Sequence, residues 1–295
     1  MRETLAGRIG AALDASMAPE VRAIAAELGS AADARAVLFY GSNLRTGSLE
    51  GVLDFYVLLP GPQRDWIWPR VSYLEWQGGA DTLRAKVATM ALAQFARAAR
   101  GESRDTTIWA RFVQPAGLAW AADHDAREEV IAAISGAART AARLAAALGP
   151  EQGTAEDYWR ALFRATYRAE FRIEKAGREN DILAVNEAHF AGLLPLAWEA
   201  EGIAFHRDRD RLTPSITARA RSRTLTWWRV RQRLGKPLNL LRLAKASTTF
   251  EGAARYAAWK VERHTGVPVA LTPWREKHPI LAAPGVLWRV WRARS

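Results

Sequence analysis

Two short apolar segments near the start of the chain constrain its fold more than any other feature. Residues 36–40 (Ala-Val-Leu-Phe-Tyr) end at Gly41-Ser42, and residues 52–59 end at Pro60-Gly61-Pro62. Apolar segments of about four to eight residues, bounded by glycine or proline, are typical of buried β-strands. The sequence therefore predicts a β-sheet in this part of the chain, with Asp54 as a charged residue inside its second strand.

Helical periodicity is the main pattern in the rest of the chain. It predicts helices over residues 3–29 with a break near Pro19, 126–148, 158–175 and 181–200. Between Thr106 and Trp120, the run Thr-Ile-Trp-Ala-Arg-Phe-Val-Gln-Pro predicts a further strand. We therefore expect an α+β protein. It would have a domain with a mixed β-sheet (residues 1–125), a mostly helical domain (126–204) and a basic amphipathic C-terminal region (205–295).

Charge and cysteine content narrow the possible functions. The chain carries 42 Lys and Arg against 31 Asp and Glu, a net charge of +11, and it has no cysteine. A basic surface attracts nucleic acid, anionic lipid or nucleotide, although an arginine-rich composition is also typical of GC-rich genomes. The absence of cysteine excludes disulfides, thiolate metal sites and thiol nucleophiles. The five histidines lack metal-ligand spacing, which argues against a zinc site.

Membrane-directed patterns are confined to the C-terminal region. The N-terminus lacks the apolar core of a signal peptide, and no run of about 18 uncharged apolar residues occurs. Tryptophans lie among basic residues at positions 227, 228, 259, 274, 288 and 291. Segments such as 286–294 suit an interfacial helix, whereas 225–234 equally suits a core helix with a solvated basic face. We expect a peripheral protein on the cytoplasmic face of a membrane, in a bacterial-type cytoplasm, with Trp288 and Trp291 contacting lipid.

One small constellation of residues carries chemistry. A strand that ends in Gly41-Ser42, followed by Asp54 in a second strand, is the arrangement that nucleotidyl transfer needs. The glycine allows close approach of a phosphate, the serine donates hydrogen bonds, and the aspartate binds Mg²⁺. The alternative is an ordinary turn beside a buried, hydrogen-bonded acid. The widespread version of this motif has a second carboxylate two residues on, where this chain has Tyr56.

Several further segments match a known family in the same order along the chain. They are Phe39-Tyr-Gly-Ser-Asn43, Leu53-Asp-Phe-Tyr-Val-Leu58, Ser72-Tyr-Leu74 with Gly78, Leu83-Arg-Ala-Lys-Val87, Thr107-Ile-Trp-Ala-Arg111 with Gln114-Pro115, Tyr167-Arg-Ala-Glu-Phe-Arg172 and Leu243–Gly252. In these segments the chain resembles the mitochondrial family of CTP-dependent phosphatidate cytidylyltransferases, within the nucleotidyltransferase superfamily. That family has no second acid two residues after its aspartate. The chain departs from it at Asn43 (Gly in the family) and Glu170 (Asp), and Arg70 stands near a family histidine.

The resemblance implies an enzyme that uses CTP and Mg²⁺ to convert phosphatidic acid into CDP-diacylglycerol and pyrophosphate, with residues 1–125 as the nucleotidyltransferase domain. The expected site residues are Ser42, Asp54 and Lys86 for catalysis; Gly41, Ser42, Lys86, Arg111 and Arg172 for the nucleotide; Asp54 and Glu170 for the metal; and Lys245, Trp288 and Trp291 for lipid and headgroup. Each basic residue has the alternative of being a surface charge or an ion-pair partner.

Two other functions remain open on the sequence. A nucleotidyltransferase of this kind can have another acceptor, such as RNA, a metabolite or a protein side chain. Basic charge suits RNA, but no aromatic-rich stacking motif is present, which argues against nucleic acid. A non-catalytic relative that only binds membranes is the other alternative. The sequence leaves the oligomeric state and the preferred base undetermined.

Overall fold

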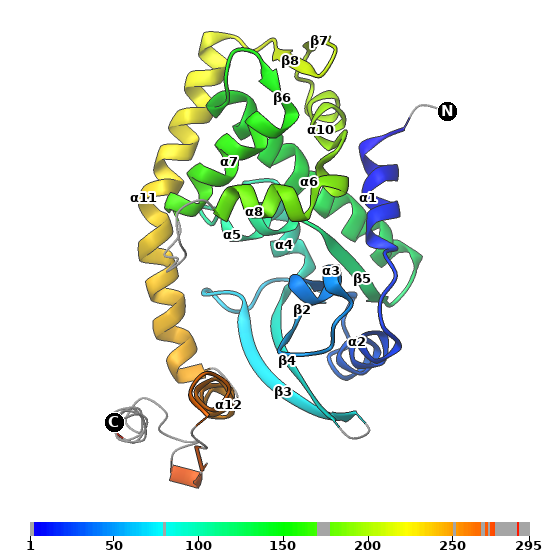
Figure 1. Ribbon diagram of the computed structural model, residues 1–295, viewed down its shortest axis with the longest axis vertical. Coiled ribbons are helices and arrows are strands. Elements are labelled where there is room, and N and C mark those ends of the chain that lie inside the picture. Colours follow the sequence, from blue (N-terminus) through cyan, green and yellow to red (C-terminus); the bar gives the residue numbers. More distant parts are fainter. Residues whose placement is uncertain are drawn as a thin grey trace.

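The computed structural model describes residues 3–78, 81–169, 178–249, 252–266, 269–270, 272–274 and 288. It is a mixed protein of helices and strands, consistent with the predicted α+β class. Figure 1 shows a curved sheet with a helical layer above it and one long helix along the side.

The main sheet has five strands in the order β3-β4-β2-β1-β5. Its strands are β1 (Ala36–Tyr40), β2 (Leu53–Leu59), β3 (Arg70–Gly78), β4 (Asp81–Ala91) and β5 (Ala116–Ala121). The β2–β4 pair is parallel, and the other neighbours are antiparallel. The two strands predicted from the short apolar segments are confirmed as β1 and β2. A second, small sheet has the order β6-β8-β7, formed by β6 (Gly153–Thr154), β7 (Phe205–Asp208) and β8 (Arg211–Pro214).

Helices cover both faces of the main sheet. They are α1 (Leu5–Leu13), α2 (Pro19–Ala31), α3 (Ser42–Thr46), α4 (Leu92–Ala99), α5 (Thr107–Phe112), α6 (His124–Leu148), α7 (Ala155–Ala169), α8 (Arg178–Val185), α9 (Glu187–Phe190), α10 (Leu193–Glu201), α11 (Ala218–Thr249) and α12 (Ala253–Thr265). The break predicted near Pro19 is confirmed as the gap between α1 and α2.

Two apolar cores result from the alternation of side chains along the strands. Val37, Phe39 and Phe55 face α2, whereas Tyr40 and Tyr56 face the helical layer around α6. The second core continues from α1 and the sheet through α6 and α7 to Trp228 of α11, so one packed interior crosses residue 125. The predicted division of the chain at that position stays a prediction.

Helix α6 lies at the centre of this interior. By length and composition alone it passes the test for a membrane span, but 78% of its apolar window is buried inside the protein. A buried helix of a globular core meets the same test, so α6 is weak support for a membrane span.

Three sequence predictions need correction. The run from Thr107 to Phe112 is the helix α5, and the strand begins only at Ala116. Asp105 favours a turn at the start of this helix by accepting hydrogen bonds from Thr107 N and Oγ1 at 3.1 and 2.7 Å. The single helix predicted over 181–200 is three helices, α8 to α10. Gly192, at φ 75°, turns the chain before the last of them. The helix predicted over 158–175 begins earlier, at Ala155, and is described to Ala169.

The stretch 225–234 adopts the core-helix alternative rather than an interfacial one. It lies within α11, where the Trp227 and Trp228 rings lie 6.0 and 6.1 Å from the Trp109 ring. The Arg231 guanidinium stacks 4.0 Å from the Trp227 ring and donates to the carbonyls of Gly101 and Ser103. These tryptophans therefore bind α11 to the rest of the fold.

The contact between α11 and α7 depends on a glycine. A Cβ atom at Gly235 would lie 2.3 Å from the carbonyl oxygen of Ala169. We expect Gly235→Ala to lower the free energy of unfolding by about 1–3 kcal/mol, because two backbones would have to separate. Gly10→Ala in α1 is the matched control. Its Cβ would meet Ile131 at an ordinary 3.4 Å, so we expect unchanged or slightly higher stability. Urea denaturation measures both, and equal effects would contradict the close contact.

Candidate active site

A row of polar side chains crosses the main sheet in register. Tyr40 of β1 pairs with Asp54 of β2, Asp54 pairs with Lys86 of β4, and Lys86 pairs with Tyr73 of β3. Residues paired in this way lie on the same face of a sheet. Because Tyr40 belongs to the core around α6, the row faces the helical layer. Asp54 therefore lies near the start of the central strand, on the sheet face that packs against the α6 layer.

Gly41 shapes the backbone directly beside this aspartate. It ends β1 and begins α3 with φ 93° and ψ −163°, a conformation that only glycine adopts readily. A Cβ atom at this position would also lie 3.2 Å from Oδ2 of Asp54. The backbone conformation and the close approach both require glycine, so the carboxylate lies against the start of α3.

Asn43 fixes the loop that connects α3 to β2. Its side chain is buried, and its amide nitrogen donates to the carbonyls of Ser48 and Glu50 at 2.8 Å each. Ser42, which precedes it, has an exposed side chain whose hydroxyl lies 3.4 Å from Oδ1 of Asn43. In the sequence, Asn43 is only a departure from the family pattern. In the structure, Asn43 joins the start of α3, where Ser42 lies, to the loop that leads into the strand of Asp54.

A cavity of about 380 Å³ opens above this point, a size suited to a small-molecule ligand. It is formed by β1, α3, β2, α5, α7 and α8 and the loop after α5. Its lining residues are Tyr40, Gly41, Ser42, Arg45, Asp54, Arg111, Gln114, Pro115, Tyr167, Asp181, Ile182, Val185 and Asn186.

Arg111 enters the cavity from α5, with its guanidinium 5.1 Å from the centre of the Tyr40 ring. The helix that carries it is anchored at its start by Asp105, which is buried. Asp105 in turn forms an ion pair of 2.5 Å with Arg242 of α11. The position of Arg111 therefore depends on a contact with the distant helix α11.

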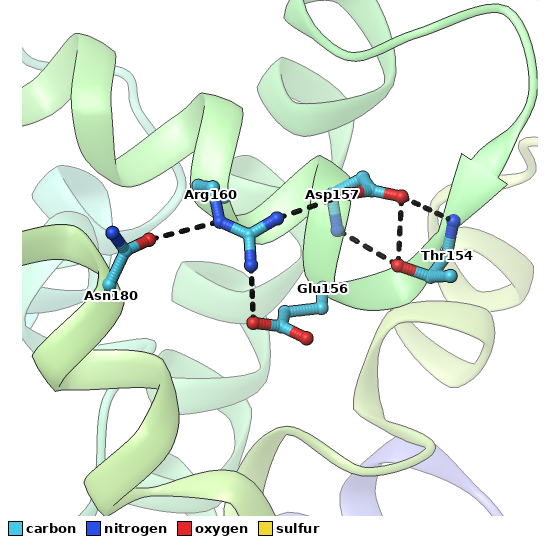
Figure 2. A network of polar contacts seen from close by, with 5 residues as sticks. All are labelled: Thr154, Glu156, Asp157, Arg160 and Asn180. Atoms are coloured by element: carbon cyan, nitrogen blue, oxygen red, sulfur yellow. Dashed lines mark hydrogen bonds and ion pairs between the residues drawn. The ribbon is translucent and has the colours of Figure 1, made fainter.

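Helices α7 and α8, which also line the cavity, are joined by a polar network at the start of α7 (Figure 2). Thr154 caps the helix, because its Oγ1 accepts a hydrogen bond from Asp157 N at 3.2 Å, and Asp157 in return accepts from Thr154 N and Oγ1 at 2.9 Å each. Arg160 donates to Oδ1 of Asp157 at 3.0 Å and to Oε1 of Glu156. Its Nε also donates to Oδ1 of Asn180 on α8 at 3.0 Å. This contact ties α7 to the helix that carries the next residue, Asp181, into the cavity.

The charges around Asp54 act on it in opposite directions. Burial raises the pKa of the Asp54 carboxyl, while the cations Lys86 and Arg111 lower it, and the net change is upward. Burial also disfavours the charged form of Lys86 and so lowers its pKa. The charge of Asp54 opposes that change, whereas the charges of Arg111 and Lys260 add to it. The ionised carboxylate is therefore held where water solvates it poorly, which a bound cation would relieve.

The structure brings four of the predicted site residues into one cavity: Gly41, Ser42, Asp54 and Arg111. Lys86 lies beside Asp54 in the sheet but does not line this cavity. Lys245 lies elsewhere, with Nζ 2.5 Å from the carbonyl of Ile67 and 3.7 Å from Asp65. Trp288 is 55% exposed. Glu170, Arg172 and Trp291 lie outside the described residues.

Sequence patterns miss three polar residues of the cavity: Arg45 of α3, Asp181 of α8 and Asn186, which directly follows α8. No spacing or neighbouring residue distinguishes them from ordinary surface residues, so no sequence signal identifies them. Among the residues that the structure describes, no group of three or more acidic or histidine side chains could hold a metal ion. Mg²⁺ commonly uses one or two carboxylates and completes its shell with substrate phosphates and water. A cavity with Asp54 on its floor and Asp181 in its wall fits that donor set.

Comparison with known proteins adds no identification: no family model matches the chain, and no curated protein matches it.

We expect Asp54→Asn to raise the melting temperature in Mg²⁺-free buffer at pH 7 by roughly 2–4 °C. Since the folded pKa of Asp54 is raised, the ionised acid costs stability, and this cost appears as pH rises from the unfolded pKa through the folded one. The difference between variant and wild type should therefore vanish in acid. Scanning calorimetry with the exposed Asp210→Asn as control measures this. If Asp54→Asn instead lowers the melting temperature, the carboxylate of Asp54 serves only a structural ion pair.

Proposed function

We propose that this protein is a nucleotidyltransferase, a CTP-dependent phosphatidate cytidylyltransferase that uses Mg²⁺. The observation that carries the proposal is convergence. The segments that resemble that family are far apart in the chain, yet Gly41-Ser42, Asp54, Arg111 with Gln114-Pro115, and Tyr167 line one cavity. Such an arrangement is expected if the segments serve one ligand, and it is not required by the apolar core alone.

The residues of the cavity suit a nucleoside triphosphate. Gly41 lets a phosphate approach the backbone, and the Ser42 hydroxyl donates to its oxygens. The planar Arg111 guanidinium can bind phosphate oxygens through two hydrogen bonds. Asp54 would hold Mg²⁺ together with the phosphates. When bound, the metal ion neutralises charge on the triphosphate.

The proposed reaction is a displacement at the α-phosphorus of CTP. An oxygen of the phosphatidate phosphate forms a bond to that phosphorus, and the bond to the oxygen that bridges to the β-phosphorus breaks. Pyrophosphate leaves with the electron pair, and CDP-diacylglycerol remains. Because a phosphate oxyanion is already a nucleophile at neutral pH, no general base is needed, which suits a cavity lined by no histidine among the described residues.

Exposed apolar side chains support the proposal that the enzyme works on a membrane surface. Trp66 is 82% exposed, and Leu240 and Leu241 of α11 are about half exposed. Lys245 and Arg242 of α11 donate to the carbonyls of Ile67 and Trp68, so they hold the Trp66 loop against α11. An exposed indole beside a basic helix is suited to the lipid interface. Lys245 would then position the loop rather than bind a headgroup.

Purified protein incubated with CTP, Mg²⁺ and vesicles of phosphatidic acid should release pyrophosphate and form CDP-lipid. We expect Asp54→Ala to lower kcat at least about 100-fold, because the metal loses its protein ligand. Chelation of Mg²⁺ should have the same effect. ATP and vesicles without phosphatidate are the controls. Wild-type turnover no higher than that of Asp54→Ala would refute the lipid assignment. Pyrophosphate release with another acceptor would identify a different nucleotidyltransferase. The absence of pyrophosphate release with every triphosphate tested would identify a non-catalytic protein.

Arg111 offers a separate test of the nucleotide site. We expect Arg111→Ala to raise the KM for CTP at least about tenfold, the cost of one charge-assisted hydrogen bond. Arg111→Lys should recover only part of that loss, because an ammonium group cannot bind two phosphate oxygens in the same planar way. Steady-state kinetics measures both. Arg229→Ala, on the exposed side of α11, is the control for loss of a positive charge. If Arg111→Ala leaves the KM for CTP unchanged, Arg111 is excluded from the nucleotide site.

A further inference from the structure

Helix α12 covers the sheet face on the side of Asp54 that is opposite to α5. It begins at Gly252, at φ 77°, where a Cβ atom would lie 2.4 Å from the carbonyl oxygen of Tyr73 on β3. One turn later the Tyr256 ring lies 5.4 Å from the Tyr73 ring. Figure 1 shows α12 beside β3, at the foot of α11. The row Tyr40–Asp54–Lys86–Tyr73 is thus covered by α5 at one end and by α12 at the other.

Basic side chains of α12 lie against the part of the sheet that carries Asp54. The Trp259 ring is in contact with two guanidinium groups, those of Arg84 at 5.5 Å and Arg263 at 5.2 Å. A Cβ atom at Gly51 would lie 3.1 Å from Nη1 of Arg263, so this guanidinium touches the backbone three residues before Asp54. Lys260 is close enough for its charge to lower the pKa of Lys86. Lys86, Lys260 and Arg263 are called the α12-side cations below.

Little negative charge compensates this cluster. Within the part of the chain that the structure describes, none of the three α12-side cations forms an ion pair with a carboxylate, and Asp54 is the acid whose charge acts on Lys86. Lys86 and Lys260 repel each other, Arg263 adds a third positive charge on the same side of Asp54, and the arrangement becomes favourable when an anion lies among them. Lys86 is also partly buried, so an anion that reaches it would be held in a poorly hydrated position.

We propose that Lys86, Lys260 and Arg263 bind the phosphate monoester of the acceptor, an inference that rests on the proposed function. The argument is positional. In β-strand order, Tyr40 with the overlying Arg111 lies on one side of Asp54, and Lys86 lies on the other. In phosphoryl and nucleotidyl displacement, the attacking and leaving oxygens lie roughly in line on opposite sides of the phosphorus. If pyrophosphate leaves on the Arg111 side, the attacking phosphate enters on the α12 side.

The charge of the acceptor agrees with this placement. A phosphate monoester carries nearly two negative charges at neutral pH, and it must approach a triphosphate that repels it. Three cations offset that repulsion while leaving a phosphate oxygen free to form the new bond to the α-phosphorus. No proton transfer is required, because the oxygen attacks as an anion. Lys86 therefore serves the acceptor rather than the triphosphate.

Kinetics separates the two phosphate sites. We expect Lys260→Gln and Arg263→Gln each to raise the KM for phosphatidate about tenfold, with the KM for CTP unchanged. Lys260→Arg should retain most of the affinity. Lys236→Gln, an exposed position on α11 with the same loss of charge, is the control for general attraction to anionic vesicles. If the KM for CTP rises instead, or if Lys236→Gln has the same effect, the proposal is overturned.

Binding without turnover distinguishes this proposal from the proposed function. Phosphorus NMR titration in the absence of CTP should show line broadening of glycerol 3-phosphate by the wild type and loss of it in both variants. A short-chain soluble phosphatidate and vesicles of phosphatidylcholine with phosphatidate then separate a lipid acceptor from a soluble one. Broadening without any CDP product would support the site and refute the cytidylyltransferase. CDP-lipid formation with unaltered phosphatidate KM in both variants, or no wild-type broadening, would refute the site.

Discussion

An ionisable carboxylate on the face of an apolar sheet that packs against the α6 layer is the constraint on which the rest of this structure depends. Burial disfavours the charge of Asp54, so its surroundings must supply compensation or a ligand. Gly41 lies against one carboxylate oxygen, Lys86 stands in register on the next strand, and Arg111 acts from above. An apolar core does not need any of these features, and placing charges beside it lowers the stability of the fold. Together they place a poorly solvated carboxylate among fixed positive charges at the edge of a cavity.

The second half of the chain holds the first half in its working geometry. Arg242 of α11 pairs with buried Asp105, which forms the turn that starts the helix carrying Arg111. Arg231 of α11 donates to the carbonyls of Gly101 and Ser103, just before that turn. A helix that is basic in sequence thus uses part of its charge inside the fold. The exposed remainder is what a polyanionic surface would meet.

Sequence patterns predict the local elements and the floor of the site. Strands β1 and β2, helix α6 and the pairing of Gly41-Ser42 with Asp54 follow from apolar runs and turn residues close together in the chain. Non-local features were not predictable in this way. The parallel β2–β4 register sets Lys86 beside Asp54, and the turn formed by Asp105 favours a helix over 107–112 despite its β-prone residues. Asp181 reaches the cavity only through the packing of α8 on α7.

The pair formed by Arg242 and Asp105 joins two residues that are synthesised far apart in time. A ribosome releases the strand that carries Asp54 long before α11, and N-terminal segments of a large protein begin to fold as they emerge. The sheet can therefore collapse early, whereas the anchor of Arg111 is complete only when most of the chain has left the exit tunnel. A nascent chain would carry the aspartate without its guanidinium partner in place. Under the proposed function, nucleotide binding would then be a late property of the polypeptide, acquired when translation is nearly finished.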